Sequence, residues 1–347
     1  MMMRILMCGP DAPTGGVATH TRCITEELGK MGVNVISCTF TGSSVRRMYH
    51  RTLGLILRSW EKRKEFDIIH VQSSGGIMSF VSAVSGVIAA KLTARPLIVT
   101  YHYNEPHLPS KILFRYVIRN LRYLFLVSNL QKKIVLDLFP EYAGVISVIP
   151  NGFNKKSFSL MDSARCRDVL ELPRDKKIIV IVGNLLEVKG HHFLLEAIRT
   201  TGRKDIFCFI VGDGPLKNKL QAEIKADGLE DQVTLVGFQP LKDLPLWMNA
   251  ADIFVLSSLS EGNPTVMFEA LGCGLPFIGT RVGGVPDIIT SDEYGLLVDP
   301  ADSGELAEKI LTALNRNWDR EKISAYAEHY TWENIAKGIV NVYEQVL

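Results

Sequence analysis

Two glutamates frame the most informative segment of the sequence, which reads Ser260-Glu261-Gly262-Asn263-Pro264-Thr265-Val266-Met267-Phe268-Glu269. Asn263 suits the N-cap of a helix and Pro264 its first position, where no amide hydrogen is needed. Glu261 then lies on the loop before this helix and Glu269 on its second turn. The free amides at the helix start, that of Thr265 included, favour an anion such as a phosphate. The segment therefore predicts a nucleotide-sugar site.

A lysine and two glycines offer further contacts for a phosphate. Lys189 lies in the turn between a predicted strand, residues 178–183, and a helix that begins at Gly190, where a phosphate-binding lysine is expected. Gly15 and Gly16 follow the first predicted strand and open a helix, so their amides can approach a ligand closely. They do not form the G-x-G-x-x-G pattern, which argues against a dinucleotide-binding oxidoreductase.

Strands and helices alternate along the chain, and the pattern starts twice. The first half has predicted strands near residues 4–8, 33–39, 67–71, 97–101, 123–127 and 145–149, with helices at 17–30, 45–65, 76–93 and 110–120. The second half has strands at 178–183, 207–211, 233–236, 253–256 and 276–280, after a predicted linker over residues 150–175. Short apolar strands joined by helices predict an α/β fold with two Rossmann-like, doubly wound parallel sheets facing a cleft.

Length and composition agree with a packed globular protein of two domains. The chain has 347 residues, of which 47% are hydrophobic and 22% charged, and this excludes a disordered chain. Six scattered cysteines without a C-x-x-C pair predict free thiols in a reducing compartment. No window approaches 18 uncharged apolar residues, so we expect a cytoplasmic protein with no membrane span.

The net charge of +2 conceals a basic N-terminal half. Residues 1–150 carry 18 Lys and Arg against 9 Asp and Glu, whereas the remainder carries 21 against 28. Basic and apolar residues alternate at helical spacing in residues 45–65 and 111–122, and this pattern suits docking on an anionic membrane surface. An ordinary amphipathic helix with a solvated charged face explains the same residues. Nucleic-acid binding is not expected, since no recognition motif accompanies the charge.

Several ordered motifs resemble the retaining glycosyltransferases of the family-4 (group 1) type, which have the GT-B fold. They are Gly15-Gly16-Val17, His102 after a strand, Pro150-Asn151-Gly152-Phe153-Asn154, Gly183-x-Leu185 with Lys189-Gly190, Gly212-Asp213-Gly214-Pro215, Val236-Gly237-Phe238, Glu261-x7-Glu269 and Gly283-Gly284-Val285-Pro286-Asp287. The resemblance covers essentially the whole chain. It implies an acceptor-side domain over residues 1–155, a donor-binding domain over residues 156–331, and a last helix, residues 332–347, that packs back onto the first domain.

The resemblance also implies roles for single residues. Glu269 is expected to accept hydrogen bonds from the ribose of the donor, and Glu261 from the transferred sugar. Lys189 is expected to stabilise the diphosphate, and His102 to contact the donor sugar or support the reaction. The donor-binding set is completed by Gly15, Gly16, Asn184, Gly212, Phe238, Asn263, Pro264 and Thr265, with Gly212 and Phe238 near the base. Tyr103, Asn104 or Glu105 could line the acceptor pocket.

One residue departs from the family pattern. The family commonly has Gly-Arg-Leu where this chain has Gly183-Asn184-Leu185, and Asn184 brings no charge to the diphosphate. No Asp-x-Asp motif on a strand appears, so neither a metal nor another cofactor is expected. His191 and His192 do not have the spacing of a metal pair and are expected to be surface or packing residues.

The sequence thus predicts a retaining, metal-independent hexosyltransferase. It would move a sugar from a UDP- or GDP-sugar to a glycan or lipid-linked acceptor in cell-surface polysaccharide synthesis, with possible peripheral attachment to the inner face of the membrane. The alternative, motivated by Asn184, is a catalytically weak nucleotide-sugar-binding protein or a partner subunit of a glycosyltransferase complex. A further alternative is another GT-B enzyme, such as an epimerase or a phosphorylase; no pyridoxal-phosphate lysine motif supports the phosphorylase.

Overall fold

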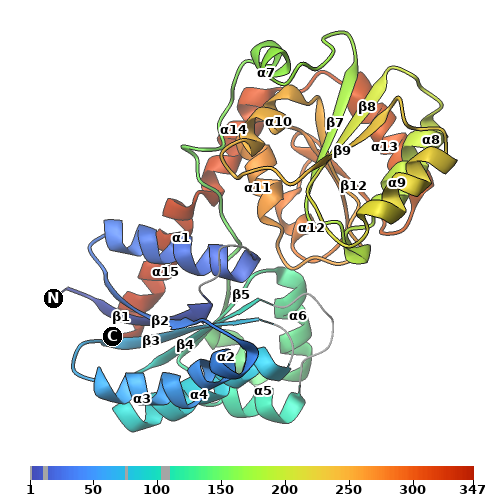
Figure 1. Cartoon of the computed structure of the whole chain (residues 1–347). Coiled ribbons are helices and arrows are strands. Elements are labelled where there is room, and N and C mark those ends of the chain that lie inside the picture. The colour runs from blue at the N-terminus through green and yellow to red at the C-terminus, as the bar shows by residue number, and fades with distance from the viewer. Residues whose placement is uncertain (1, 11–14, 75–76, 103–109) are drawn as a thin grey trace. The chain divides into compact units, whose positions relative to one another are not determined.

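The computed structural model describes residues 2–10, 15–74, 77–102 and 110–347. The chain divides into two compact units: unit 1 comprises Met1–Gly152 with Trp332–Leu347, and unit 2 comprises Phe153–Thr331. Each unit contains a six-stranded sheet in which every described strand pair is parallel (Figure 1). The prediction of two doubly wound α/β sheets is therefore confirmed. Within the described residues, no helix is both long enough and apolar enough to cross a membrane.

The sheet of unit 1 has the strand order β2-β1-β3-β4-β5-β6. Its strands are β1 (Arg4–Pro10), β2 (Asn34–Phe40), β3 (Ile68–Ser74), β4 (Leu97–His102), β5 (Tyr123–Leu126) and β6 (Ile146–Val148). The central strands are buried on both faces, as parallel strands covered by helices must be. Strand β1 begins the unit, and the chain then builds β2 on one side of it and β3 on the other.

Helices cover both faces of this sheet (Figure 1). They are α1 (Gly16–Lys30), α2 (Ser44–Arg51), α3 (Leu53–Glu61), α4 (Ile77–Thr93), α5 (Lys111–Ile118), α6 (Asn129–Leu138) and α15 (Trp332–Val346), with a 3-10 turn over Pro140–Val145. Helices α1 and α15 pack together on one face, where Ile24 and Ile339 belong to the same buried cluster. Helices α3 to α6 contribute to the cluster on the other face.

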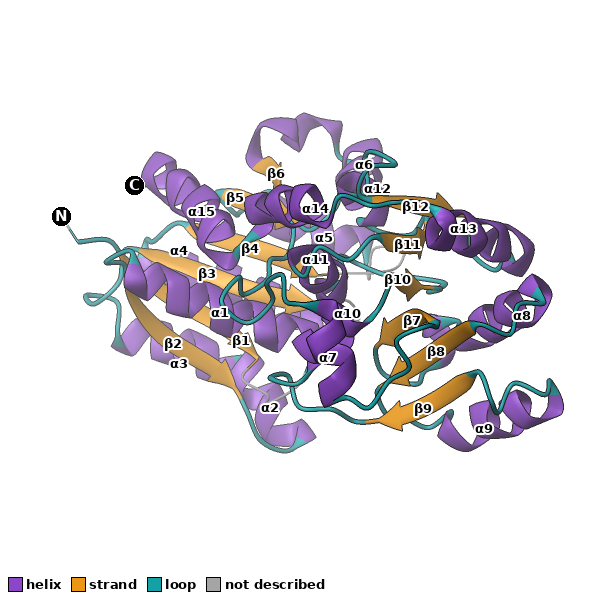
Figure 2. Ribbon diagram, turned by 90° about the horizontal axis from the view of Figure 1, so that it is seen from above, coloured by secondary structure: helices purple, strands orange, loops and turns teal. Residues whose placement is uncertain are grey.

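Unit 2 repeats this architecture with the strand order β12-β11-β10-β7-β8-β9. Its strands are β7 (Lys177–Val182), β8 (Ile206–Val211), β9 (Val233–Gly237), β10 (Ile253–Leu256), β11 (Phe277–Thr280) and β12 (Gly295–Val298). Figure 2 shows β7, β8 and β9 lying side by side. The β-branched run of β7, Ile-Ile-Val-Ile-Val, suits a central strand that is buried on both faces.

The helices of unit 2 also form two layers. They are α7 (Ser163–Val169), α8 (His191–Thr201), α9 (Lys217–Ala226), α10 (Leu244–Ala250), α11 (Thr265–Gly272), α12 (Val285–Ile288), α13 (Ser303–Asn315) and α14 (Arg320–Ala327), with 3-10 turns over Glu187–Lys189 and Glu328–Tyr330. Helices α8, α9 and α13 share one buried cluster with the sheet. Helices α10, α11, α12 and α14 share the cluster on the other face.

Three predictions of local structure were wrong. The expected helix over residues 45–65 is two helices, because the backbone of Thr52 leaves the helical region and its hydroxyl caps the Met48 carbonyl at 2.8 Å. The expected linker over residues 150–175 contains helix α7 and the fully buried Phe158, which packs in the core of unit 2. The prediction also missed β12, whose four residues are too short to stand out by pattern.

Glycine allows two backbone segments to meet at the end of β11. Gly283 has a left-handed backbone with φ of +53°, and a Cβ there would lie 2.0 Å from the carbonyl oxygen of Glu261. The amide of Gly284 donates to the carbonyl of Gly262 at 2.7 Å. A side chain at residue 283 would therefore force apart the loops that follow β10 and β11.

We expect Gly283→Ala to destabilise unit 2 by about 2–5 kcal/mol, since it adds overpacking to left-handed strain. Gly202→Ala is the matched control, because Gly202 has φ of +64° and open space around its Cβ position; we expect about 1–2 kcal/mol from strain alone. Hydrogen exchange of the β10 and β11 amides measures the loss of stability in each variant. Equal losses would contradict the close approach at residue 283.

Candidate active site

The order in which strands are added to the sheet of unit 2 changes direction between β7 and β10. These two strands are neighbours, with Ile253 opposite Ile179 and Phe254 opposite Val180. Strands β8 and β9 lie beyond β7, whereas β11 and β12 lie beyond β10. The loops that leave the carboxyl ends of β7 and β10 therefore diverge, and such a switch point is where open α/β sheets bind ligands. Lys189 follows β7 and Glu261 follows β10.

Lys189 and Glu261 form an ion pair at this switch point. The ammonium of Lys189 lies 2.6 Å from Oε1 of Glu261, although 72 residues separate them. The hydroxyl of Ser258 donates to the same oxygen at 2.6 Å. Glu261 is only 7% exposed, and a buried carboxylate requires such partners. The structure thus brings together the predicted phosphate-binding lysine and the predicted sugar-binding glutamate.

Gly190 allows the lysine loop to approach β10. Its φ is +61°, and a Cβ there would lie 2.1 Å from the carbonyl oxygen of Ser257. The Ser257 hydroxyl donates to the Lys189 carbonyl at 3.2 Å, and the Leu259 amide donates to the Val188 carbonyl at 2.7 Å. These contacts fix the main chain on which Lys189 is carried. Helix α8 begins one residue later than predicted, at His191.

Helix α11 begins at Thr265, one residue after the predicted start. Pro264 is its N-cap, with ψ of 120°, so the proline lies outside the helix and Asn263 precedes the cap. The predicted capping role of Asn263 was therefore wrong, and its side chain is 6% exposed and directed into the protein instead. The amides of Thr265 and the next residues still open the helix beside the loop that carries Glu261.

Glu269 lies on the second turn of α11, as predicted, and is half-buried. Burial raises the pKa of its carboxyl from the ordinary value of a glutamate to about 7. Among the described residues, no side chain or amide donates a hydrogen bond to this carboxylate and no cation pairs with it. A half-buried acid that has no partner among these residues is well suited to accept hydrogen bonds from a ligand.

The other predicted donor residues lie along the carboxyl edge of β7, β8 and β9. Gly212 has φ of +148° and packs so tightly that a Cβ would lie 1.9 Å from the Gly183 carbonyl oxygen; its amide donates to the Gly237 carbonyl at 2.9 Å. Asn184 is exposed and is the second residue after β7. Phe238 is 68% exposed after β9, so it is not a core residue. Contact of these residues with a nucleotide remains a prediction.

Unit 1 carries the remaining predicted residues at the carboxyl edge of its own sheet. Gly15 is the N-cap of α1 with φ of +115°, and Gly16 is the first helical residue. His102 is the last residue of β4, and its Nε2 lies 2.8 Å from Oε1 of Gln72 on β3. Burial, with smaller contributions from His20 and His70, holds the pKa of His102 well below its usual value, so the ring is neutral. Tyr103, Asn104 and Glu105 lie outside the described residues.

Sequence reasoning missed the groups that hold His102. Gln72 and His70 are both buried, and the ring of His20 lies 4.6 Å from that of His102 between centroids. The signal was present in β3, where His70 and Gln72 interrupt an apolar strand at a spacing of two and therefore share one face of the sheet. Two polar residues on the buried face of a strand indicate a hydrogen-bond network.

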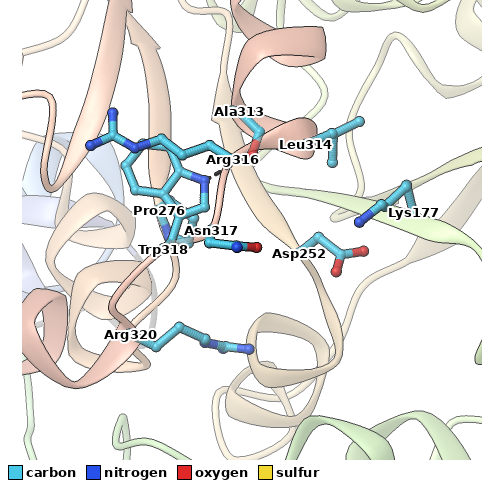
Figure 3. Close-up of a pocket in the computed structure, with 9 residues that line it drawn as sticks. All are labelled: Lys177, Asp252, Pro276, Ala313, Leu314, Arg316, Asn317, Trp318 and Arg320. Carbon is cyan, nitrogen blue, oxygen red and sulfur yellow. Dashed lines mark hydrogen bonds between the residues drawn. The ribbon is translucent and has the colours of Figure 1, made fainter.

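A cavity of about 420 Å³ opens at the opposite, amino edge of the unit 2 sheet, where Lys177 begins β7 and Asp252 precedes β10 (Figure 3). Several of its polar groups already serve the fold. Asp252 accepts hydrogen bonds from Arg167 at 2.9 Å and from the Ile178 amide at 2.6 Å. Figure 3 shows Arg316 beside the indole of Trp318, 4.4 Å from the ring centroid. This cavity is separate from the switch-point residues.

His191 is 1% exposed, consistent with a packing residue. No group of three or more His, Cys, Asp or Glu side chains with the geometry of a metal site occurs in the part of the chain that the structure describes.

Comparisons with known proteins cover both units. Residues 162–330 match the family model of group 1 glycosyl transferases, and residues 14–156 match that of glycosyltransferase family 4. The phosphatidylinositol N-acetylglucosaminyltransferase GPI3 subunit of Saccharomyces cerevisiae is 25% identical over 371 aligned positions, which cover 96% of this chain and 80% of that protein.

Solved structures show the same fold. A glycosyltransferase from Rickettsia africae superposes with a TM-score of 0.84 at 20% identity, covering 99% of this chain and 98% of that one. The Anabaena protein HepE, solved in complex with UDP, superposes with a TM-score of 0.79 at 21% identity, covering 99% of this chain and 100% of that one. The two family models follow each other in order along the sequence, and this chain belongs to the group 1, family 4 glycosyltransferases with the GT-B fold.

Proposed function

We propose that this glycosyltransferase moves a sugar from a UDP- or GDP-sugar to a glycan or lipid-linked acceptor, with retention of anomeric configuration and without a metal ion. The observation that carries the proposal is the ion pair between Lys189 and Glu261 at the switch point of unit 2. One group of this pair suits a diphosphate, and the other suits the hydroxyls of a sugar. The UDP complex of HepE, a protein of the same fold, supports a nucleotide donor.

Donor binding would rearrange this ion pair. A diphosphate that approaches the start of α11 competes with Glu261 for the ammonium of Lys189. The carboxylate of Glu261, which keeps its bond from Ser258, can then accept a hydroxyl of the transferred sugar. Glu269, on the second turn of α11, accepts hydrogen bonds from the ribose hydroxyls.

Catalysis in this proposal depends on position and charge more than on a nucleophile from the protein. Lys189 stabilises the negative charge that develops on the departing diphosphate, and the diphosphate itself helps to deprotonate the acceptor on the same face of the sugar. The neutral ring of His102 forms a hydrogen bond with a hydroxyl of the donor sugar. These groups hold the reactants in a productive orientation.

The acceptor is proposed to be presented at a membrane surface. Large apolar side chains are exposed on α2, α3 and α5, namely Val45, Leu53, Leu57, Trp60 and Ile112 at 82%, 60%, 50%, 47% and 82% exposure. These helices lie on the same side of the unit 1 sheet (Figure 1) and carry arginines at positions 46, 47, 58 and 115, and Arg119 follows α5 directly. The yeast relative is named for transfer to phosphatidylinositol, which supports a lipid acceptor.

Asn184 favours one alternative, a catalytically weak nucleotide-sugar-binding protein or partner subunit of a glycosyltransferase complex. Its exposed amide can donate a hydrogen bond at the carboxyl end of β7 but adds no positive charge beside Lys189. Such a protein would bind nucleotide sugars without turnover.

Donor turnover separates the two functions. With a panel of UDP- and GDP-sugars and lipid-linked acceptors, we expect nucleotide release that requires acceptor, persists in EDTA, and falls about 100-fold or more in Glu261→Gln. Glu293→Gln, an exposed glutamate paired with Lys322 at 2.6 Å, is the matched control and should keep wild-type turnover. Nucleotide binding without turnover for any acceptor would favour the alternative.

The raised pKa of Glu269 predicts opposite effects of Glu269→Gln on stability and on binding. An acid whose folded pKa, about 7, exceeds its unfolded value contributes stability at low pH that is lost as pH rises through 7. Glu269→Gln should therefore raise the Tm of the ligand-free protein at pH 8, with a much smaller effect near pH 4.5.

The same substitution should weaken nucleotide binding and remove its pH dependence. In the wild type, affinity should rise between pH 6 and pH 8, as the carboxylate that accepts the ribose hydroxyls becomes ionised. Calorimetric titration with UDP and GDP measures this, with Glu308→Gln on the exposed face of α13 as control. A pH-independent wild-type affinity would argue against Glu269 as a ribose ligand.

Membrane docking predicts co-sedimentation with anionic phosphatidylglycerol vesicles at low salt and release at high salt. Leu53→Glu with Trp60→Glu should reduce binding about 10-fold or more, since both apolar contacts are lost and negative charge is added. Leu241→Glu, an equally exposed leucine of unit 2 at 57%, should have little effect. A wild-type protein that stays in the supernatant at low salt would exclude this surface as a membrane contact.

A further inference from the structure

A chain of buried polar side chains runs through unit 1 from His102 to the C-terminal helix. Gln72 and His70 lie on the face of β3 that packs against α15. Both are buried, at 2% and 0% exposure. Their partners come from β4 and α15, so residues from three distant parts of the sequence meet here.

The distances define a continuous series of hydrogen bonds. Oε1 of Gln72 lies 2.8 Å from Nε2 of His102, and Nε2 of Gln72 lies 3.3 Å from Nε2 of His70. The other ring nitrogen of His70, Nδ1, lies 2.5 Å from the hydroxyl of Tyr343 on α15. The hydroxyl of Thr100 also reaches Nε2 of His70, at 2.7 Å.

The side-chain amide of Gln72 determines which ring nitrogens of His102 and His70 carry hydrogen. An amide oxygen can only accept a hydrogen bond, so Nε2 of His102 must carry the hydrogen. An amide NH₂ can only donate, so Nε2 of His70 accepts and its Nδ1–H donates to the Tyr343 hydroxyl. In this arrangement the one lone pair left in the plane of the His102 ring belongs to Nδ1.

We propose that Gln72 is a positioning residue that holds His102 as the neutral Nε2–H tautomer, with Nδ1 as a fixed acceptor for a substrate hydroxyl. His70 and Tyr343 hold the amide of Gln72 in the orientation that this requires. The inference rests on the proposed role of His102 beside the donor sugar. It extends that role to two buried residues and to the last helix of the chain, none of which needs to touch substrate.

The surroundings of His102 keep the ring uncharged without a carboxylate. Burial lowers the pKa values of His20 and His70 to about 3, and these are the titratable groups that act on His102. His20 packs between His102 and Trp332, with ring centroids 4.6 and 5.4 Å away. A neutral amide is therefore the group that selects the tautomer, because no charged partner competes for His102 among the described residues.

The tautomer of His102 can be measured by NMR on the wild-type protein, without an activity assay. In ¹⁵N-histidine-labelled protein at pH 7, we expect His102 to show a protonated Nε2 and an unprotonated Nδ1, with one-bond coupling to hydrogen at Nε2 alone. A protonated Nδ1 at His102 would overturn the proposal, since the amide would then face the other way.

Variants of Gln72 connect the tautomer to the reaction. Gln72→Leu should yield a mixture of tautomers and lower kcat about 10–100-fold with little change in donor KM. Gln131→Leu is the matched control, a buried glutamine of the same unit whose side chain accepts the Val127 amide at 3.0 Å; it should leave the His102 signals unchanged. An unchanged tautomer in Gln72→Leu would contradict the proposal.

Gln72→Glu separates positioning of His102 from a purely structural role, because a structural role would leave the pH dependence of turnover unchanged. A carboxylate beside Nε2 raises the pKa of His102, so turnover should fall as pH decreases through that new value, where the wild type shows no such inflection. A pH profile identical to the wild type, in a variant whose NMR spectrum shows a folded protein, would count against positioning by Gln72. If the tautomer changes and turnover does not, the link between Gln72 and His102 stands and the role of His102 in the reaction fails.

Discussion

The site of unit 2 depends on the need of one buried carboxylate for a cation. Glu261 is 7% exposed, and a charge so far from water must be paired or it destabilises the fold. Lys189 and Ser258 supply the partners. For them to reach Glu261, the loops after β7, β10 and β11 must approach one another closely, and Gly190 and Gly283 are the residues that allow it.

Unit 1 solves a related problem without charge. His102 ends strand β4, His70 lies within β3 and His20 on α1, and burial lowers the pKa of all three rings so that they are neutral. A neutral network in a medium of low dielectric loses little by desolvation, provided that its groups find partners. The side-chain amide of Gln72 has an oxygen that accepts from Nε2 of His102 and an NH₂ group that donates towards Nε2 of His70, so it can join two neutral imidazoles.

Much of the fold was predictable because its strands are short β-branched runs that parallel sheets bury on both faces. The pairing of Lys189 with Glu261 was not, since it joins residues 72 positions apart and no local pattern reports such a contact. The break at Thr52 was also missed, because the apolar spacing continues through it. The contact of His70 with Tyr343 spans 273 positions, and the helical pattern of the last segment gave no indication that its tyrosine meets β3.

Asn184 changes the charge that a donor would encounter. In the ligand-free protein Glu261 pairs with Lys189, so a diphosphate would meet a lysine that is already paired with an acid. Without the arginine that is common at position 184, the amides at the start of α11 must contribute a larger share of the binding.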